Sequence, residues 1–285
     1  MTTPPTPQAP YQQPPAPQEN MHGLYASPIP VRAATLGDAL ASEWTKIRSV
    51  RSTMWTLGVL VVLLLGFGIM AAVLLSMTDA VIGDVPELSF GFFGVLLGSI
   101  CVITLGVLTI ASEYSTGLIR TTLTACPSRS RVLTAKAIVF FLLTFTITTV
   151  VTAVVGAVQV AMLDGKEPSG DDWLRATVGV GLYIALLGLL SLAIGALIRH
   201  SAGAITIMIG VVLLPLVLAM FMFSDSLADL RQALFEYSIP SQLSAFYDTS
   251  VTGSGPSGWD PLWIMLGLTA AAMVAAYATL DQRDV

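Results

Sequence analysis

Six uninterrupted runs of apolar residues dominate the chain from residue 54 onwards. Each contains at least 20 residues without Asp, Glu, Lys or Arg, and they lie at Met54–Met77, Leu88–Ala111, Ala137–Leu163, Ala176–Ile198, Ala202–Phe223 and Pro261–Leu280. An α-helix needs about 20 residues to cross a hydrocarbon core of about 30 Å, so each run is long enough to span a bilayer. The pattern predicts an all-α polytopic membrane protein with six transmembrane helices.

The amino-acid composition supports a location in the membrane. Hydrophobic residues make up 54% of the 285 residues and charged residues only 11%, whereas charged residues make up about 25% of an average soluble protein. Charged side chains are therefore too few to cover a soluble domain of this size. The net charge of −5 also excludes a basic nucleic-acid-binding protein. We expect the lipid bilayer, and no nucleic acid, among the partners of the chain.

Lysine and arginine residues set the expected orientation, because they are retained on the cytoplasmic side of a membrane. One side of the six-span layout holds ten of them, and the other side holds only Lys166, Arg175 and Arg231. This asymmetry predicts cytoplasmic amino and carboxyl termini, in a multi-pass protein of the plasma or inner membrane.

The first part of the chain has a different composition. Nine of the sixteen prolines lie in the first thirty residues, where aliphatic side chains are scarce. Such a segment cannot bury a core, so residues 1–31 are expected to form a disordered proline-rich tail. Residues 32–285 then form the six-helix transmembrane domain.

Motifs for enzymatic chemistry are missing from the sequence. Of the two histidines, His22 lies in the tail and His200 at the inner end of the fourth run, so no histidine-rich metal site or triad is expected. No G-x-x-x-x-G-K-[ST] phosphate-binding loop occurs. The apolar runs also lack the ionisable groups that ion-coupled carriers place within the membrane. We expect no catalytic activity, metal or cofactor in the chain itself.

A short amphipathic segment precedes the first apolar run. At 100° per residue its apolar side chains fall within an arc of about 120°; they are Leu36, Leu40, Trp44, Ile47 and Val50. Basic residues flank the stripe, which is typical of a helix lying in the cytoplasmic membrane interface. Glu43 interrupts the stripe, and its expected partner is either Lys46 or a basic group elsewhere. The helix serves either as an anchor alone or also as a contact for a partner.

The segment 112–136 connects the second and third runs on the cytoplasmic side. Gly117 breaks the second helix, and Pro127 stops a short helix of about eight residues that follows it. Ser128 or Ser130 is expected to cap the next long helix, whose first turns carry Arg129, Arg131 and Lys136. These basic residues act either as topology determinants that contact lipid or as part of a docking lever below the membrane.

These two segments resemble the corresponding parts of type-2 ABC transporter permeases, particularly those of actinobacteria. The resemblance rests on Ser42-Glu43-Trp44-Thr45-Lys46-Ile47-Arg48-Ser49, on Glu113-Tyr114-Ser115-Thr116-Gly117 with Pro127-Ser128-Arg129 and Lys136, and on the Arg283-Asp284 ending. It extends from about residue 36 to the end of the sequence and includes the six-span layout.

The resemblance implies a permease subunit of an ATP-driven exporter. Two separate ATP-binding cassette subunits would bind ATP and Mg²⁺, and the second permease would be another copy of this chain or a homologous permease. The implied coupling residues, in and around a coupling helix at about Leu118–Ala125, are Glu113, Gly117, Leu118, Arg120, Leu123, Pro127, Arg129 and Arg131. A connecting helix beside it would contain Leu40, Glu43, Trp44, Lys46, Ile47 and Arg48. The alternatives are a channel or carrier that acts without an ATPase, and an anchor or sensor subunit that transports nothing.

Polar side chains within the spans are the candidate lining of a transport pathway. In the third run, a stripe about 80° wide is formed by Thr144, Thr148, Thr152 and Gln159. A membrane threonine can instead bond its own i−4 carbonyl, whereas a glutamine amide has no such local partner. In the outer segment 224–260, Pro240 separates two apolar patches. The resemblance implies two short helices there that partly re-enter the membrane, and a helix lying in the interface fits the pattern equally well.

Overall fold

The computed structural model describes residues 34–78, 83–249 and 254–282. The proline-rich tail expected at residues 1–31 lies outside the described residues. Regular structure within the described residues is helical throughout, apart from an isolated bridge between Pro86 and Lys166. The all-α prediction is confirmed for this part of the chain.

Six spans in the described residues are long and apolar enough to cross a membrane. Two of them are composite, because a short 3-10 helix (η1) precedes α3, and a short α-helix and a π-helical turn (η2) precede α7. The spans are α2 (Arg51–Met77), η1 with α3 (Glu87–Gly91, Phe92–Thr116), α5 (Arg129–Met162), α6 with η2 and α7 (Gly170–Leu174, Arg175–Gly179, Val180–Ile198), α8 (Ser201–Phe221) and α11 (Asp260–Gln282). Their positions match the six apolar runs, so the prediction of a multi-pass membrane protein is confirmed.

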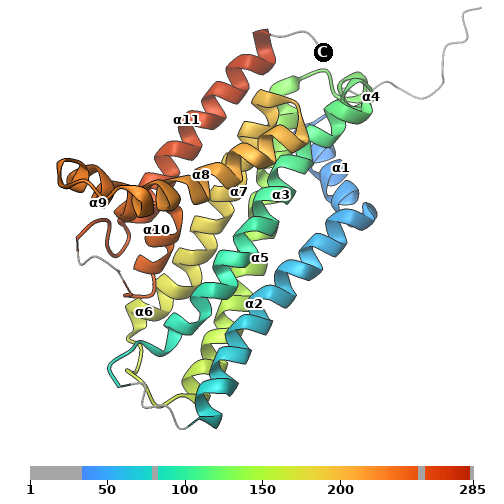
Figure 1. The fold of residues 1–285 in the computed structure, drawn as a ribbon. Helices are drawn as coiled ribbons and strands as arrows, with labels where there is room; N and C mark the ends of the chain where they lie inside the picture. Colours follow the sequence, from blue (N-terminus) through green and yellow to red (C-terminus); the bar gives the residue numbers. More distant parts are fainter. Residues whose placement is uncertain (1–33, 79–82, 250–253, 283–285) are drawn as a thin grey trace, which may run out of the picture. The chain divides into compact units, whose positions relative to one another are not determined.

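Helix α7 is the central helix of this bundle (Figure 1). It packs against α3, α5 and α11, and its span is the most deeply buried of the six. Glycines bring α7 close to α3, since a Cβ atom added to Gly106 would overlap the carbonyl oxygen of Gly188. Membrane helices commonly pack through such small residues. Helix α7 thereby fixes α3 and α5, which carry the site described below.

Large apolar side chains cover much of the outward surface of α2, α8 and α11. Five of them, each more than 65% exposed, are Trp55, Val62, Phe221, Trp263 and Val274. Exposure to water would cost roughly 25 cal/mol for each Å² of apolar area. Such a surface is typical of helices that contact lipid or another membrane subunit.

Shorter helices occupy the ends of the bundle. At one end, α1 (Leu36–Ser49) and α4 (Leu118–Ala125) lie near the carboxyl-terminal end of α11 (Figure 1). The bounds of α4 are those expected from Gly117 and Pro127. The remaining short helices follow α8 and are η3 (Asp225–Leu227), α9 (Ala228–Glu236) and α10 (Ile239–Ala245).

Helix α10 is buried among the spans. Pro240 lies in the first turn of this helix, where the missing N–H of proline costs no hydrogen bond. Just after α10, the ring of Phe246 packs edge-on against Tyr183 of α7, with ring centroids 5.6 Å apart. Tyr247 packs in the same way against Phe92 of α3, at 6.3 Å. The second apolar patch of the outer segment therefore fills the space between spanning helices.

Candidate functional site

Helix α1 faces the bundle with the side that carries Glu43 and Ile47. It begins with a capping box, in which Thr35 accepts a hydrogen bond from the Asp38 backbone and Asp38 accepts one from the Thr35 backbone. The helix packs against α5. Glu43 is the one buried residue of this helix, whereas Leu36 and Trp44 are exposed. The side of the helix that carries Glu43 and the partly buried Ile47 therefore faces the bundle, and the apolar stripe is divided between the bundle and the exposed surface.

Helix α4 is fixed at both ends by its connections to α3 and α5. Gly117 ends α3 with a φ of 73°, a left-handed conformation that glycine adopts without strain. Cys126, before Pro127, is extended, as the steric effect of a following proline requires. Ile119 is buried, and Leu118 is exposed. Helix α4 thus anchors one apolar side chain in the bundle and presents another outwards.

Basic side chains at the start of α5 bind backbone carbonyls. Ser128 caps the helix by accepting a hydrogen bond from the backbone N–H of Arg131. The guanidinium of Arg131 donates to the carbonyl oxygen of Ala34, just before α1. Arg129 Nη1 donates to the carbonyl oxygen of Leu280 at 2.7 Å. These bonds tie α5 to both α1 and α11.

Glu43, Lys46, Glu113 and Lys136 meet in one ion-pair cluster between α1, α3 and α5. Lys136 Nζ donates to Glu43 Oε2 at 2.9 Å and to Glu113 Oε1 at 2.6 Å. Lys46 Nζ donates to Glu43 Oε1 at 2.8 Å and to Glu113 Oε1 at 2.9 Å. It also lies 3.5 Å from Thr122 Oγ1 of α4. Both kinds of partner expected for Glu43, the neighbouring lysine and a distant basic group, are present.

The ion-pair cluster contains two carboxylates and two ammonium groups. The side chain of Lys136 is 1% exposed and that of Lys46 36%. Burial lowers the pKa of Lys46, but hydrogen bonds and charge interactions with Glu43 and Glu113 outweigh this effect and raise the pKa above its ordinary value. Removing one partner from a buried ion pair leaves an uncompensated charge, at a cost of about 3–5 kcal/mol. The cluster therefore depends on all four side chains.

A further contact joins α3 to the turn between α7 and α8. The guanidinium of Arg199 lies over the ring of Tyr114, with 4.9 Å between its central carbon and the ring centroid. A cation over an aromatic face is attracted by the ring quadrupole. His200 Nδ1 accepts a hydrogen bond from the Gly203 backbone and so caps α8.

A cleft of about 370 Å³ opens beside the ion-pair cluster, between the ends of α2 and α3. These helices are close near Gly94, where an added Cβ would lie 3.1 Å from the carbonyl oxygen of Leu64. They separate towards the end that carries the cluster, and we call this space the α2–α3 cleft. A second hollow of about 300 Å³ lies between α1 and α4 and also reaches Glu43 and Lys46.

The expected coupling and connecting residues fall into three groups. Those in the ion-pair cluster are Glu43, Lys46 and Glu113. Those at the surface of the same end are Trp44, Arg48, Gly117, Leu118, Arg120 and Pro127. Those partly covered by neighbouring helices are Leu40, Ile47, Leu123, Arg129 and Arg131. The two sequence segments thus lie at one end of the bundle, and the cluster joins them.

The sequence pattern did not reveal the role of Lys136. It placed this lysine among basic residues that either contact lipid or form part of a docking lever, whereas the structure makes it the most deeply buried lysine of the ion-pair cluster. One signal was present, because Lys136 stands between Ala135 and Ala137, about two helical turns after the cap residue Ser128. A lysine that far into a helix, with small apolar neighbours, indicates burial against another helix.

The polar stripe of α5 lies inside the bundle of this chain. Thr144 and Thr148 are buried, and the Thr152 hydroxyl donates to the carbonyl oxygen of Thr148 at 2.8 Å. Gln159 Nε2 donates to the carbonyl oxygen of Gly68 on α2 at 3.3 Å. The space beside Thr152 and Gln159 is about 10 Å³, close to the least that one water molecule requires. The space beside Thr152 and Gln159 is therefore too small to form an open channel.

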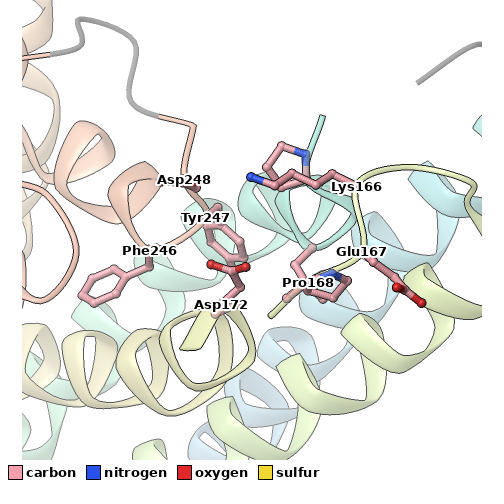
Figure 2. Close-up of a pocket in the computed structure, with 10 residues that line it drawn as sticks. Lys166, Glu167, Pro168, Asp172, Phe246, Tyr247 and Asp248 are labelled. Atoms are coloured by element: carbon pink, nitrogen blue, oxygen red, sulfur yellow. The ribbon is translucent and has the colours of Figure 1, made fainter. Parts of the chain in front are cut away.

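A narrow pocket lies at the opposite end of the bundle. Figure 2 shows Lys166 and Pro168 on one side of it, Tyr247 and Asp248 on the other, and Asp172 below Tyr247. Its volume is about 10 Å³, too small for a ligand larger than water. Arg175 forms ion pairs of 2.8 Å with Asp171 and 2.5 Å with Asp172, and lies 3.9 Å from Asp248. Arg175 is thus paired mainly within its own span, and its contact with the segment that follows α10 is the longest of the three.

In the described part of the chain, no group of three or more His, Cys, Asp or Glu side chains is arranged to hold a metal ion. No protein-family model matches the sequence, and no curated protein matches it either. The ion-pair cluster and the cleft beside it are therefore interpreted from their own geometry and chemistry.

Proposed function

We propose that this chain is the transmembrane permease subunit of an ATP-driven ABC exporter and works with separate ATP-binding subunits. One observation carries the proposal. Glu43, Lys46, Glu113 and Lys136, all in segments that resemble type-2 ABC permeases, form a single ion-pair cluster that joins α1, α3 and α5. A shared contact between residues up to 93 positions apart supports the resemblance more strongly than separate short motifs do.

Helix α4 is the proposed contact with the ATPase. A force on this helix would reach α3 through Gly117 and α5 through Pro127. The ion-pair cluster would carry the same displacement to α1, and from there to α2, which begins directly after it. A partner that binds one of two helix packings more tightly shifts the population towards that packing. In this mechanism, ATP binding and hydrolysis in the partner switch the permease between the two helix packings.

The proposed assembly contains two ATP-binding subunits, which hold ATP and Mg²⁺, and two permease subunits. The second permease is another copy of this chain or a homologue. The exposed apolar surfaces of α2, α8 and α11 support a place for it, because a second membrane subunit can cover such a surface as well as lipid can.

The end of the bundle that carries α1 and α4 is the proposed cytoplasmic end, with both termini there and the protein in the plasma or inner membrane. The distribution of basic residues supports this orientation: Arg48, Arg51 and Arg120 are exposed at this end. Helix α1 would lie in the cytoplasmic interface. Its exposed Leu36 and Trp44 would then contact lipid.

The polar stripe of α5, from Thr144 to Gln159, remains the proposed lining of the pathway. Gln159 is bonded to Gly68 of α2 in the closed bundle, so opening along the stripe requires α2 to move away from α5. Helix α2 is also the span that continues from α1. A shift of α1 could therefore open the stripe.

Co-purification tests the proposed partnership. The full-length chain, affinity-tagged, is isolated from cells of its own organism, and bound ATP-binding cassette subunits are quantified by mass spectrometry. Arg120→Glu, which reverses an exposed charge on α4, is expected to lower their amount at least about tenfold, a loss equivalent to 1.4 kcal/mol of binding. The matched control is Arg231→Glu, at an exposed arginine on α9, which should retain the wild-type amount. The proposal is wrong if wild-type chain retains no such subunit, or if the two variants retain equal amounts.

A further inference from the structure

The α2–α3 cleft has two chemically different parts. Leu105 and Leu108 of α3 form an apolar wall, Ile47, Val50 and Leu118 add apolar side chains, and the rest of the lining is polar. The polar lining includes Lys46 and Glu113 and several hydroxyl side chains, namely Ser52, Thr53, Thr56, Thr109, Ser112, Thr121 and Thr122. A volume of about 370 Å³ falls within the range of small-molecule sites. The ligand that matches this lining is an amphiphile.

The polar part of the cleft lies at the depth of lipid headgroups. The α2 span has 27 residues, about 40 Å at 1.5 Å per residue, which exceeds a hydrocarbon core of about 30 Å. The first turns of α2 therefore extend beyond the core. Trp55 lies there and is 76% exposed, as expected for an indole ring at the membrane interface. A lipid beside α2 would bring its headgroup to the same level.

Hydroxyl groups in the cleft act mainly as hydrogen-bond acceptors. Thr56, Thr109 and Ser112 each donate their proton to a carbonyl oxygen of their own helix, at 2.9, 2.7 and 2.5 Å. Their remaining lone pairs can accept hydrogen bonds from a ligand. Lys46 can donate a hydrogen bond to a ligand. Its contact with Thr122 Oγ1 measures 3.5 Å, which is at the long, weak limit of a hydrogen bond. The cleft can thus bind a ligand that carries a hydrogen-bond donor next to an anionic group.

Glu113 adds an acceptor that the protein leaves unused. Its Oε1 atom accepts hydrogen bonds from both Lys46 and Lys136, whereas Oε2 is buried and accepts none from the described residues. Buried carboxylate oxygens are normally hydrogen-bonded. Since Glu113 lines the cleft, a ligand with an N–H donor there would satisfy this oxygen once the carboxylate turns towards it.

We propose that the α2–α3 cleft binds an aminophospholipid, with its phosphate near Lys46, its primary ammonium near Glu113 and an acyl chain along Leu105 and Leu108. A zwitterionic headgroup leaves the charge balance of the ion-pair cluster unchanged. An anionic lipid would add negative charge beside Glu113, and a choline headgroup has no N–H to donate. The soluble headgroup alone lacks the chain that matches the apolar wall. This site goes beyond the proposed transport function and does not depend on it.

Native mass spectrometry of the full-length chain in detergent tests this site. The chain is supplied with phosphatidylethanolamine, phosphatidylcholine and phosphatidylglycerol at equal concentrations, and the bound lipid is counted. We expect phosphatidylethanolamine to be retained at least about fivefold over each of the others. Thr109→Phe, which fills the cleft, should abolish this preference. Thr104→Phe is the matched control, because Thr104 lies on the same helix and bonds its own i−4 carbonyl in the same way, but does not line the cleft.

Separate outcomes test each part of the inference. Glu113→Gln keeps a similar side-chain shape but removes the charge that attracts the ammonium. This variant should therefore retain phosphatidylethanolamine and phosphatidylcholine in a ratio of about 1. Equal retention of the three lipids by the wild-type chain would overturn the inference, as would a preference for phosphatidylglycerol. Unchanged lipid binding in Thr109→Phe would place the lipid elsewhere and also overturn it. Displacement of the lipid by free phosphoethanolamine at a similar concentration would contradict the role of the acyl chain. Elution volume and melting temperature establish that each variant is folded.

Discussion

Lys136 Nζ lies 2.6 Å from Glu113 Oε1, in a contact that joins the first turns of α5 to the last turns of α3. The two residues flank helix α4 in the sequence, so the ion pair closes the loop that contains this helix. Lys136 also reaches Glu43 of α1 at 2.9 Å. One buried ammonium thus connects three helices at the end of the bundle that we propose to be cytoplasmic.

Lys136→Met should destabilise the protein by about 3–5 kcal/mol, because it leaves two buried carboxylates with only Lys46 between them. The measurement is thermal unfolding of the purified chain in detergent. Lys166→Met, at an exposed lysine, should change stability by less than about 0.5 kcal/mol. The double variant Glu113→Gln with Lys136→Met restores charge balance and should recover part of the loss. Equal effects of the two single lysine variants would contradict a structural role for the cluster.

The contribution of Lys46 should persist to alkaline pH. Its pKa is raised in the folded protein, so the folded state holds the proton more tightly than the unfolded state does. The stabilisation is fully present below the unfolded value of about 10.4 and is lost as pH rises through the higher folded pKa. The melting-temperature difference between wild type and Lys46→Met should therefore be equal at pH 7 and 9, and smaller at about pH 11. A difference that already shrinks between pH 7 and 9 is the contrary result.

Gly117→Ala should destabilise the junction between α3 and α4. The φ of 73° is left-handed, and a side chain there costs about 1–2 kcal/mol. Gly117→Asn should cost less, because asparagine tolerates this conformation better than most residues. Gly210→Ala is the control, since an added Cβ meets nothing within 4 Å in α8 and alanine favours a helix. Chemical or thermal unfolding ranks the three variants, and a neutral Gly117→Ala would argue against the left-handed junction.

Gly106→Ala should weaken the packing of α3 on α7. The new methyl group would overlap the carbonyl oxygen of Gly188, and overpacking of this kind typically costs about 1–3 kcal/mol. Gly267→Ala in α11 places a methyl group in open space and should leave the melting temperature unchanged or slightly higher. The same thermal assay compares them. If both substitutions have equal effects, the close approach of α3 and α7 is not important for stability.

Local patterns in the sequence predict much of the fold. The six spans follow from uninterrupted apolar runs, and the bounds of α4 follow from Gly117 and Pro127, because both signals act on neighbouring residues. The distant partner of Glu43 does not follow from the apolar stripe of α1, since Glu43 reaches Lys136 on another helix. A contact between residues 93 positions apart depends on how helices pack and cannot be predicted from helical periodicity.

The residues that surround the polar stripe on α5 could also be identified only from the structure. Periodicity correctly places its threonines and Gln159 on one face, but it does not say what covers that face. The carbonyl that Gln159 meets belongs to Gly68, 91 positions earlier, and is accessible because glycine carries no side chain. The sequence likewise marks the second outer patch as apolar without showing that Phe246 and Tyr247 pack against α7 and α3.

The π-helical turn η2 sets the direction in which the outer end of the fourth span faces. A π turn contains one residue more than the regular pitch needs, and each residue of an α-helix rotates the next by about 100°. Winding η2 as a regular α-helix, with no residue deleted, would rotate α6 by about that angle around the helix axis. Asp172, which lines the narrow pocket together with Tyr247 and Asp248, would then point away from the segment that follows α10. The place of Asp172 beside that segment therefore depends on the phase of one helix, set by one additional residue.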